Sequence, residues 1–262
     1  MNKYFWISFS LISGTAYTAY RYNLQKQRLN RTYYSDFILD ELQIVDNDLV
    51  KCSLKPKVPL QRESLLNNWS YITICNPYVQ AEREFSPLTR DLNDIKLFIR
   101  TYNKGTLGSY IRRWKPGDTI RVRGPHPVTN VDINQYSRII AVIAGTGIAP
   151  ILQLAHFYKK PLEVIYFVRN NVPPFYKDEL EQLSSNADVQ VIQNRPLTAS
   201  TIASILHSKE RESPDDVLFL ICGNDSFVQK LVGDVPWSSR RRLLGEPKGI
   251  LSSKQKRNFM VL

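Results

Sequence analysis

The sequence predicts a two-domain fold: an antiparallel β-barrel followed by an α/β domain with a parallel sheet, with a membrane anchor at the N-terminus. The first half has short apolar runs between Pro- and Asn-rich turns, the second half has regularly spaced apolar strands, and an uncharged stretch lies near the start. The chain of 262 residues is long enough for two modest domains. We expect the anchor and its flank in residues 1–29, the barrel domain in 30–132 and the α/β domain in 133–262.

The barrel prediction rests on five short runs, each bounded by turn residues. Such runs are typical of strands that pair through hairpins in a small antiparallel barrel. The predicted strands are Phe37–Ile44, Asp48–Leu54, Trp69–Cys75, Ile95–Thr101 and Asp118–Val122. A linker rich in Pro, Asn and Asp follows them at Pro125–Gln135.

In the second half, apolar strands alternate with helical segments. The strand starts lie about 25 to 30 residues apart, the repeat expected of βα units on a parallel sheet. The predicted strands are Ile139–Ala144, Glu163–Val168, Val189–Gln193 and Val217–Cys222. Two covering helices are predicted at Leu197–Lys209 and Ser226–Gly233.

The run 139–148 joins an unbroken apolar strand to a Gly-Thr-Gly turn that opens a helix. Gly145 and Gly147 permit a tight turn and a close approach of a ligand to the backbone. Pro150 suits the first turn of the helix that follows. Because strand–glycine–helix turns are common in α/β folds, a purely structural turn is the alternative.

A second candidate is the heptapeptide Arg83–Thr89, which presents a fixed cation, an aromatic ring and hydroxyls. On an extended segment residues two apart point the same way, so Arg83 and Phe85 share a face. A guanidinium beside an aromatic ring suits a planar cofactor that bears phosphate, and Ser86 could donate to a ring nitrogen. The alternative is an ordinary strand with one surface arginine.

A third candidate is the glycine turn at Gly105, which runs into a short predicted helix through Ile111. The free N–H groups at the start of a helix could hold a pyrophosphate.

Cysteines and histidines are few and scattered. The three cysteines lack C-x-x-C spacing, and the three histidines have no mutual spacing typical of metal ligands. We therefore expect free thiols and neither a disulfide framework nor a metal or iron–sulfur site. These residues are Cys52, Cys75, Cys222, His126, His156 and His207.

The formal charge is +11, and basic residues crowd the last two dozen positions. Such a patch could meet anionic lipid or an acidic protein, or be a solvated face. No nucleic-acid motif accompanies it, so we expect no nucleic-acid partner.

Residues 4–20 contain no charge, and tyrosines mark both ends before Arg21 ends the stretch. At about 1.5 Å per helical residue this length approaches the minimum for crossing a bilayer core. We expect a membrane anchor; a cleaved secretory signal is the alternative, although the small-residue cleavage pattern is poor.

Taken in order, these motifs resemble the flavoprotein reductases of the ferredoxin–NADP reductase and cytochrome b5 reductase group. Members of that group carry R-x-Y-[ST]-P-x-[ST], G-x-x-S-x-Y-L, G-D-x-[IV] with R-G-P, G-G-T-G-I-[TA]-P and C-G-P motifs. The corresponding segments here are Arg83–Thr89, Gly105–Ile111, Gly117–Pro125, Ala144–Pro150 and Cys222–Asn224. The resemblance implies FAD on the barrel and a nicotinamide nucleotide, NADH or NADPH, on the second domain.

Roles for individual residues follow from the resemblance. Arg83 would bind an FAD phosphate, and Phe85 would lie against the flavin where the group usually has Tyr. Ser86 would contact the reactive edge of the ring, which makes it the candidate catalytic residue. The other implied cofactor-binding residues are Thr89, the pyrophosphate cradle Leu107, Gly108 and Ser109, and the nicotinamide cleft Gly145, Thr146, Gly147, Cys222 and Gly223.

Three departures bear on which nucleotide is bound. Gly108 replaces the serine of the phosphate turn, although Ser109 stands next to it. The segment 170–174 has no carboxylate where one would select NADH, so the choice between NADH and NADPH stays open. Asn224 and Asp225 replace a proline-rich turn after Gly223.

Short strings also resemble a fungal mitochondrial branch of this group that assists haem attachment to cytochrome c. They are the anchor end 20–22, the turn with its following Leu-Gln-Leu, and the tail 249–254. The resemblance implies a mitochondrial inner-membrane protein, anchored through residues 4–20, whose soluble domain faces the intermembrane space. Its partners would be haem, apocytochrome c or the haem-attachment enzyme. A general NADH–cytochrome b5 reductase and a non-catalytic flavin-binding assembly factor are the alternatives.

Overall fold

The computed structural model describes most of the chain from residue 29 to residue 262. The described residues are 29–46, 48–58, 60, 65–76, 78, 81–101, 105–168, 177–193, 198, 200–202, 216–244, 248–253 and 258–262. They fall into two compact units that meet in sequence between His126 and Pro127, with Asn68–Ser70 counted in the second. We call the N-terminal one unit 1 and the C-terminal one unit 2.

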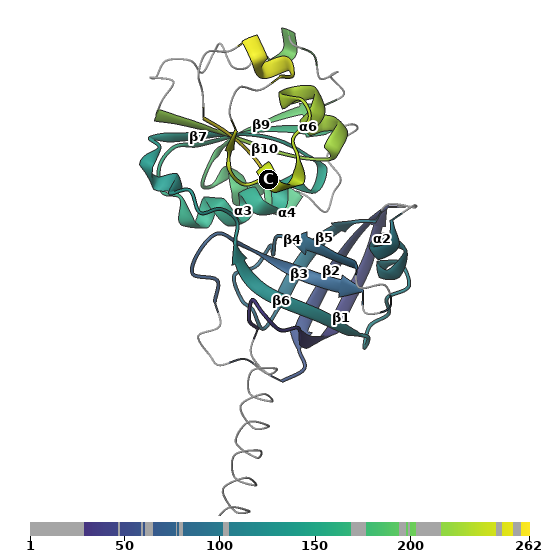
Figure 1. Ribbon diagram of the computed structural model, residues 1–262. Coiled ribbons are helices and arrows are strands. Elements are labelled where there is room, and N and C mark those ends of the chain that lie inside the picture. Colours follow the sequence, from purple (N-terminus) through teal and green to yellow (C-terminus); the bar gives the residue numbers. More distant parts are fainter. Residues whose placement is uncertain are drawn as a thin grey trace, which may run out of the picture. The chain divides into compact units, whose positions relative to one another are not determined.

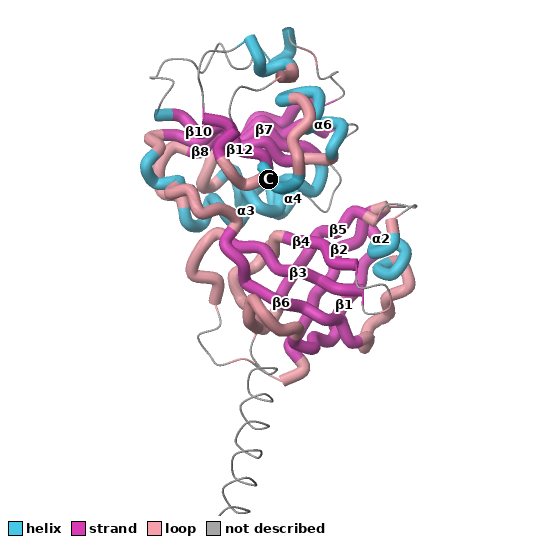
Figure 2. Tube along the Cα trace, viewed as in Figure 1, coloured by secondary structure: helices cyan, strands magenta, loops and turns pink. Residues whose placement is uncertain are grey.

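The described part of unit 1 is a six-stranded antiparallel sheet with a short helix (Figures 1 and 2). The strand order is β4-β3-β6-β1-β2-β5. The strands are β1 Ser35–Asp46, β2 Leu49–Pro56, β3 Ser70–Asn76, β4 Ala81–Phe85, β5 Ile95–Arg100 and β6 Thr119–Pro127, with helix α2 Thr106–Ile111 between β5 and β6.

Alternation of side chains fixes which face of this sheet is buried. In β1, Phe37 and Leu39 are fully buried while Asp36 and Asp40 are exposed, as a period of two requires. Phe37 lies opposite Ile120 of β6, so the two strands bury the same face. Leu107 and Ile111 of α2 are buried as well.

Unit 2 contains a second six-stranded sheet, ordered β11-β12-β10-β7-β8-β9. Five strands run parallel, and the edge strand β11 pairs with β12 in the antiparallel sense. The strands are β7 Arg138–Ala144, β8 Leu162–Val168, β9 Asp188–Gln193, β10 Val217–Cys222, β11 Leu243–Leu244 and β12 Asn258–Val261. The α-helices with described bounds in this unit are α3 Ile148–Phe157, α4 Lys177–Ser184 and α6 Asp225–Val232.

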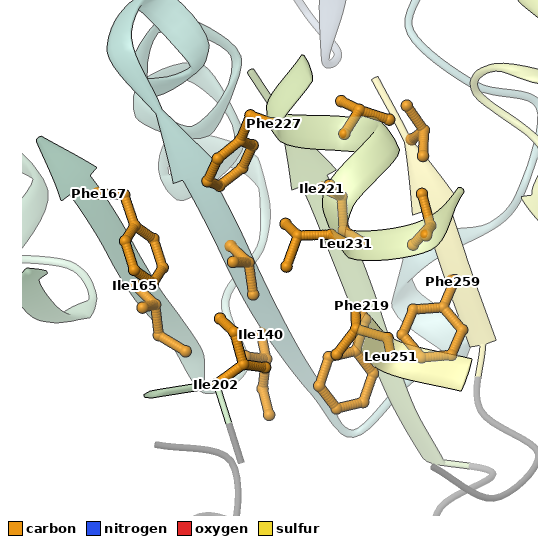
Figure 3. Packing of buried hydrophobic residues seen from close by; sticks show 14 of the residues in the cluster. Ile140, Ile165, Phe167, Ile202, Phe219, Ile221, Phe227, Leu231, Leu251 and Phe259 are labelled. Atoms are coloured by element: carbon orange, nitrogen blue, oxygen red, sulfur yellow. The ribbon is translucent and has the colours of Figure 1, made fainter. Parts of the chain in front are cut away.

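Alternate residues of the unit 2 strands form a continuous apolar core against α6 (Figure 3). Phe227 of α6 packs against Phe167 of β8 with ring centroids 5.8 Å apart. Phe219 of β10 and Phe259 of β12 are 5.3 Å apart. Burial on both faces explains why β7 and β10 are almost uninterrupted apolar runs.

The predicted arrangement of an antiparallel domain followed by a parallel α/β domain is confirmed. The first domain is a six-stranded sheet whose extra strand, β4, is too short and polar to stand out in the sequence. The second gains β11 and β12, which the sequence analysis did not predict. Most of the predicted helix 197–209, and all of the predicted anchor 4–20, lie outside the described residues. Among the described helices, none has the length and apolar character needed to cross a membrane.

Candidate functional site

Strand β4 carries the first candidate residues. It pairs with β3 so that Arg83 lies opposite Ile74 and Phe85 opposite Ile72. Directly opposed residues share a face, so Arg83 and Phe85 project to the same side of the sheet. Arg83 is exposed, and its Nη1 donates to the carbonyl oxygen of Glu82 at 2.6 Å, while Phe85 is half-buried. A cation and an apolar ring therefore stand side by side near the surface.

The segment after β4 carries Ser86 and Thr89. The backbone N–H of Leu88 donates to the carbonyl oxygen of Lys96 at 2.8 Å, which fastens this segment to β5. The Thr89 hydroxyl donates to the carbonyl oxygen of Asp94 at 2.6 Å and accepts from the N–H of Lys96 at 3.2 Å. The Thr89 hydroxyl thus holds the loop, and the half-buried Ser86 is placed directly after Phe85.

Helix α2, which packs beside β4, begins without a capping side chain. A helix leaves its first N–H groups without helical acceptors. Here the N–H of Ser109 already donates to the carbonyl oxygen of Gly105 at 2.9 Å. The amides that can meet a phosphate are therefore those of Thr106, Leu107 and Gly108, whereas Ser109 can offer its hydroxyl.

A pocket of about 800 Å³ adjoins the exposed side of α2. It is lined by polar and aromatic residues, among them Ser109, Tyr110, Arg113 and Trp114 of the helix region and Tyr78 of the β3–β4 connection. The rings of Tyr110 and Trp114 meet edge to face at 5.8 Å. Burial raises the pKa of the Tyr110 hydroxyl, so it stays protonated at neutral pH. No motif in the sequence predicts this pocket; the spacing of Tyr110 and Trp114 is its only signal.

In unit 2, the Gly145–Gly147 turn forms a 3-10 helix, η2, at the carboxyl end of β7. Gly145 has φ 58°, which L side chains rarely adopt, and its carbonyl oxygen accepts from the Tyr166 hydroxyl at 3.1 Å. A Cβ on Gly147 would lie 2.6 Å from the carbonyl oxygen of Cys222. The turn and Cys222 are thus in contact where β7 and β10 end, the edge at which parallel α/β sheets bind ligands.

Gly223 and Asn224, which follow Cys222, stabilise the start of α6. A Cβ on Gly223 would lie 2.6 Å from the Phe227 ring, so the glycine is needed for packing. The side chain of Asn224 accepts from the N–H of Phe227 at 2.9 Å and caps the helix. Asn224, a departure from the group's motif, therefore has a structural role as an N-cap.

Cys222 has a neutral thiol at this edge. Burial raises its pKa to about 12, against an opposing effect of the Arg240 and Arg241 charges. Arg240 itself pairs with Asp225 at 2.6 Å. The thiol can therefore contribute shape to this edge, but not a thiolate nucleophile, at neutral pH.

Within unit 1, Arg83, Phe85 and Ser86 are neighbours on β4 and directly after it, with α2 nearby. Within unit 2, a separate group lies at the carboxyl end of β7 and β10: Gly145, Thr146, Gly147, Cys222 and Gly223. The segment 170–174 lies outside the described residues. Among the described residues, no three His, Cys, Asp or Glu side chains gather as metal ligands would.

The chain is similar to known flavoproteins. Residues 36–130 match the family described as the oxidoreductase FAD-binding domain. An uncharacterized FAD-binding protein from Schizosaccharomyces pombe is 37% identical over 90% of this chain and 88% of its own length. NADH-cytochrome b5 reductase 1 from Coccidioides immitis is 23% identical over 86% of this chain and 82% of its own.

Solved structures share the fold. The cytochrome b5 reductase domain of Ulva prolifera nitrate reductase superposes with a TM-score of 0.60 at 16% identity, over 77% of this chain and 91% of that domain. A ferredoxin NADP+ reductase from Neisseria gonorrhoeae with bound FAD and NADP gives 0.58 at 14% identity, over 76% and 89% of the two chains.

Proposed function

Because the chain belongs to the FAD-dependent NAD(P)H oxidoreductases of the ferredoxin–NADP reductase and cytochrome b5 reductase family, we propose that it passes electrons from NAD(P)H through FAD to haem or a haem protein. The specific role proposed is that of a mitochondrial cytochrome c import factor, which supports haem attachment to cytochrome c. Its partners are then haem, apocytochrome c or the haem-attachment enzyme. The soluble units face the intermembrane space, and residues 4–20 anchor them in the inner membrane.

The observation that carries the redox part is the shared face of Arg83 and Phe85 beside the uncapped start of α2. These groups fit FAD: a guanidinium and free amides for its phosphates, and an apolar ring for its planar system. FAD takes up a hydride and releases electrons singly, chemistry that no side chain of this protein can supply.

The protein's own residues bind and orient the two nucleotides. In unit 1, Arg83 would hold phosphate, Phe85 would pack on the ring system and the Ser86 hydroxyl would be available to donate to it. In unit 2, the open space beside Gly145, where no atom lies within 4 Å of an added Cβ, would leave room for the nicotinamide nucleotide at the carboxyl edge of the sheet. The neutral Cys222 thiol keeps a negative charge away from that edge.

The acceptor is tested with the purified full chain in detergent. The visible spectrum reports bound flavin, and anaerobic NADH or NADPH should bleach it. Bleached protein should then reduce free haem and haem bound to apocytochrome c, followed by the haem absorption bands. Flavin that bleaches but reduces neither haem species contradicts the proposed acceptor, and flavin that does not bleach contradicts turnover.

The FAD assignment is tested with Arg83→Ala. Loss of a charge-assisted contact costs about 1.5–3 kcal/mol, so FAD affinity should fall about 10- to 150-fold. Lys55→Ala, which removes an exposed cation paired with Asp40, is the control and should retain FAD. Equal flavin content in both variants would rule out Arg83 as the phosphate ligand.

A general cytochrome b5 reductase is the second candidate, because a curated relative of comparable length has that activity in its name. Cytochrome b5 in place of haem in the same assay distinguishes the two. Faster reduction of cytochrome b5 than of either haem species would favour this alternative.

A further inference from the structure

We propose that a basic face of unit 1 binds the anionic phospholipid headgroups of the membrane next to the protein. The basic face consists of the exposed residues Arg31, Lys57 and Arg121, with exposed Tyr33 and Val58. The proposal rests on the anchor of the proposed function, since the anchor brings the lipid close.

All charged side chains that precede Asp36 in the sequence are basic. From Arg21 to Arg31 there are four basic residues, and the first acidic residue of the whole sequence is Asp36. A basic cluster directly after a membrane segment is the pattern that attracts anionic lipid. Each cation near a membrane surface contributes independently, so exposed cations of unit 1 add to this attraction.

The start of unit 1 is fixed against the end of β6. The N–H of Gly124 donates to the carbonyl oxygen of Asn30 at 2.8 Å. The Nε of Arg31 donates to the carbonyl oxygen of Pro125 at 2.9 Å, and the side chain of Asn30 accepts from the N–H groups of Thr32 and Tyr33. The basic run therefore enters unit 1 at a defined place.

Strand register brings two more cations to this place. Asp36 of β1 lies opposite Arg121 of β6, and on its other side the N–H of Lys57 donates to the carbonyl oxygen of Asp36 at 3.0 Å. The row on the exposed side of the sheet is therefore Lys57, Asp36 and Arg121, in which two cations flank one acidic residue. The guanidinium of Arg121 also lies 5.3 Å from the Tyr34 ring centroid, which limits its motion.

With Arg31, this face carries three cations against the one carboxylate of Asp36. Arg123, also 5.3 Å from the Tyr34 ring, is compensated by Glu82 at 2.6 Å. Arg31, Lys57 and Arg121 form no ion pair with any residue that the structure describes. Tyr33 and Val58, 47% and 46% exposed, add an aromatic and an apolar side chain of the kind that enters a headgroup layer.

Tether length favours lipid over a soluble acidic protein. Eight residues lie between Tyr20 and Leu29, so the two positions can be at most about 30 Å apart. Screening confines the attraction to about 8 Å at physiological salt, so the basic face acts only in contact with the surface. The short tether keeps it within reach of that contact.

The test uses the full chain in vesicles of phosphatidylcholine alone, or with phosphatidylglycerol replacing part of it. Val58→Cys carries a polarity-sensitive fluorophore, and Tyr78→Cys is the matched control. Tyr78 is 84% exposed and lies beside the Thr119 end of β6, away from Gly124. Labelling favours the introduced position because Cys52 and Cys75 are buried, and Cys222, which is half-buried, has a raised pKa of about 12.

We expect a blue shift at position 58 in anionic vesicles only, no shift at position 78, and reversal by salt. The triple variant Arg31→Gln, Lys57→Gln, Arg121→Gln should lower the ratio of docked to undocked protein about 100-fold, or about 5-fold per charge. Equal spectra in the two kinds of vesicle, or a shift that survives the triple variant, would overturn the proposal.

Flotation separates this proposal from the anchor. A chain that floats with neutral vesicles but shows no shift in anionic ones retains the anchor and loses the basic face. A chain that floats with anionic vesicles alone, and needs the three cations to do so, retains the basic face and refutes the anchor. A chain that floats with neither refutes both.

Discussion

Gly147→Ala tests whether the contact between the glycine turn and Cys222 organises the nucleotide-binding edge of unit 2. The backbone of Gly147 has φ −60° and ψ −10°, which alanine adopts readily, so the substitution adds only a methyl group. That methyl would lie 2.6 Å from the carbonyl oxygen, 2.9 Å from the carbonyl carbon and 3.2 Å from the Sγ of Cys222. Two of these atoms are backbone, so either the turn or the end of β10 must move.

Overpacking of this kind costs about 1–3 kcal/mol. For a chain of this size, a loss of about 2 kcal/mol lowers Tm by about 4–8 °C. Displacement of the turn should also raise the KM for NAD(P)H, while FAD content stays unchanged because the residues assigned to FAD lie in unit 1. Thermal melting, flavin absorbance and anaerobic bleaching measure the three quantities.

Gly117→Ala is the control for stability loss alone. Gly117 has φ 93° and no atom within 4 Å of a Cβ, so alanine adds backbone strain without a collision. Its cost is about 1–2 kcal/mol, with no change in the KM for NAD(P)H. If Gly147→Ala matches the wild type in both Tm and KM, the steric reasoning is wrong.

Three further outcomes follow from unit 2. Asn224→Ala removes the cap that accepts from Phe227 and should cost about 1 kcal/mol in thermal stability with FAD content unchanged. Tyr166→Phe removes the hydrogen bond to Gly145 and should cost about 0.5–1.5 kcal/mol by the same melting assay, so an unchanged Tm would show that the bond contributes nothing. Burial raises the pKa of Cys222 from 9.0 to about 12, so its contribution to stability is complete below pH 9 and is lost as the pH rises through 12. Denaturation of wild type and Cys222→Ala across that range measures the difference, and parallel pH profiles would contradict it.

The strands that the sequence predicted well are those with a strong hydrophobic signal. β7 and β10 are buried on both faces, and their apolar runs gave boundaries within one residue. β4 has the sequence Ala-Glu-Arg-Glu-Phe, in which no residue is fully buried, so pairing with β3 rather than hydrophobicity creates the strand. β12 was missed because its four residues follow a polar tail, and its burial comes from pairing with β10.

The sequence identifies candidate site residues more readily than it identifies the residues that they contact. The shared face of Arg83 and Phe85 follows from strand periodicity alone. The contact between Gly147 and Cys222 joins positions 75 residues apart, and only the parallel pairing of β7 with β10 brings them together. In the same way, the hydroxyl of Thr89 binds Asp94 and Lys96 within its own loop, which no motif reveals.

The glycine at position 108, where the family's motif has serine, has a physical explanation in the geometry of α2. Gly108 is the third residue of the helix, so its N–H has no carbonyl acceptor within the helix. A phosphate held by the amides of Thr106, Leu107 and Gly108 does not require a side chain at 108. Ser109 cannot replace the missing contact with its amide, because that N–H is bonded to Gly105, but its hydroxyl remains available. Ser109→Ala should therefore weaken FAD binding more than Gly108→Ala does, and equilibrium dialysis of FAD against both variants measures the difference. The opposite order would place the phosphate contact on the other side of the helix.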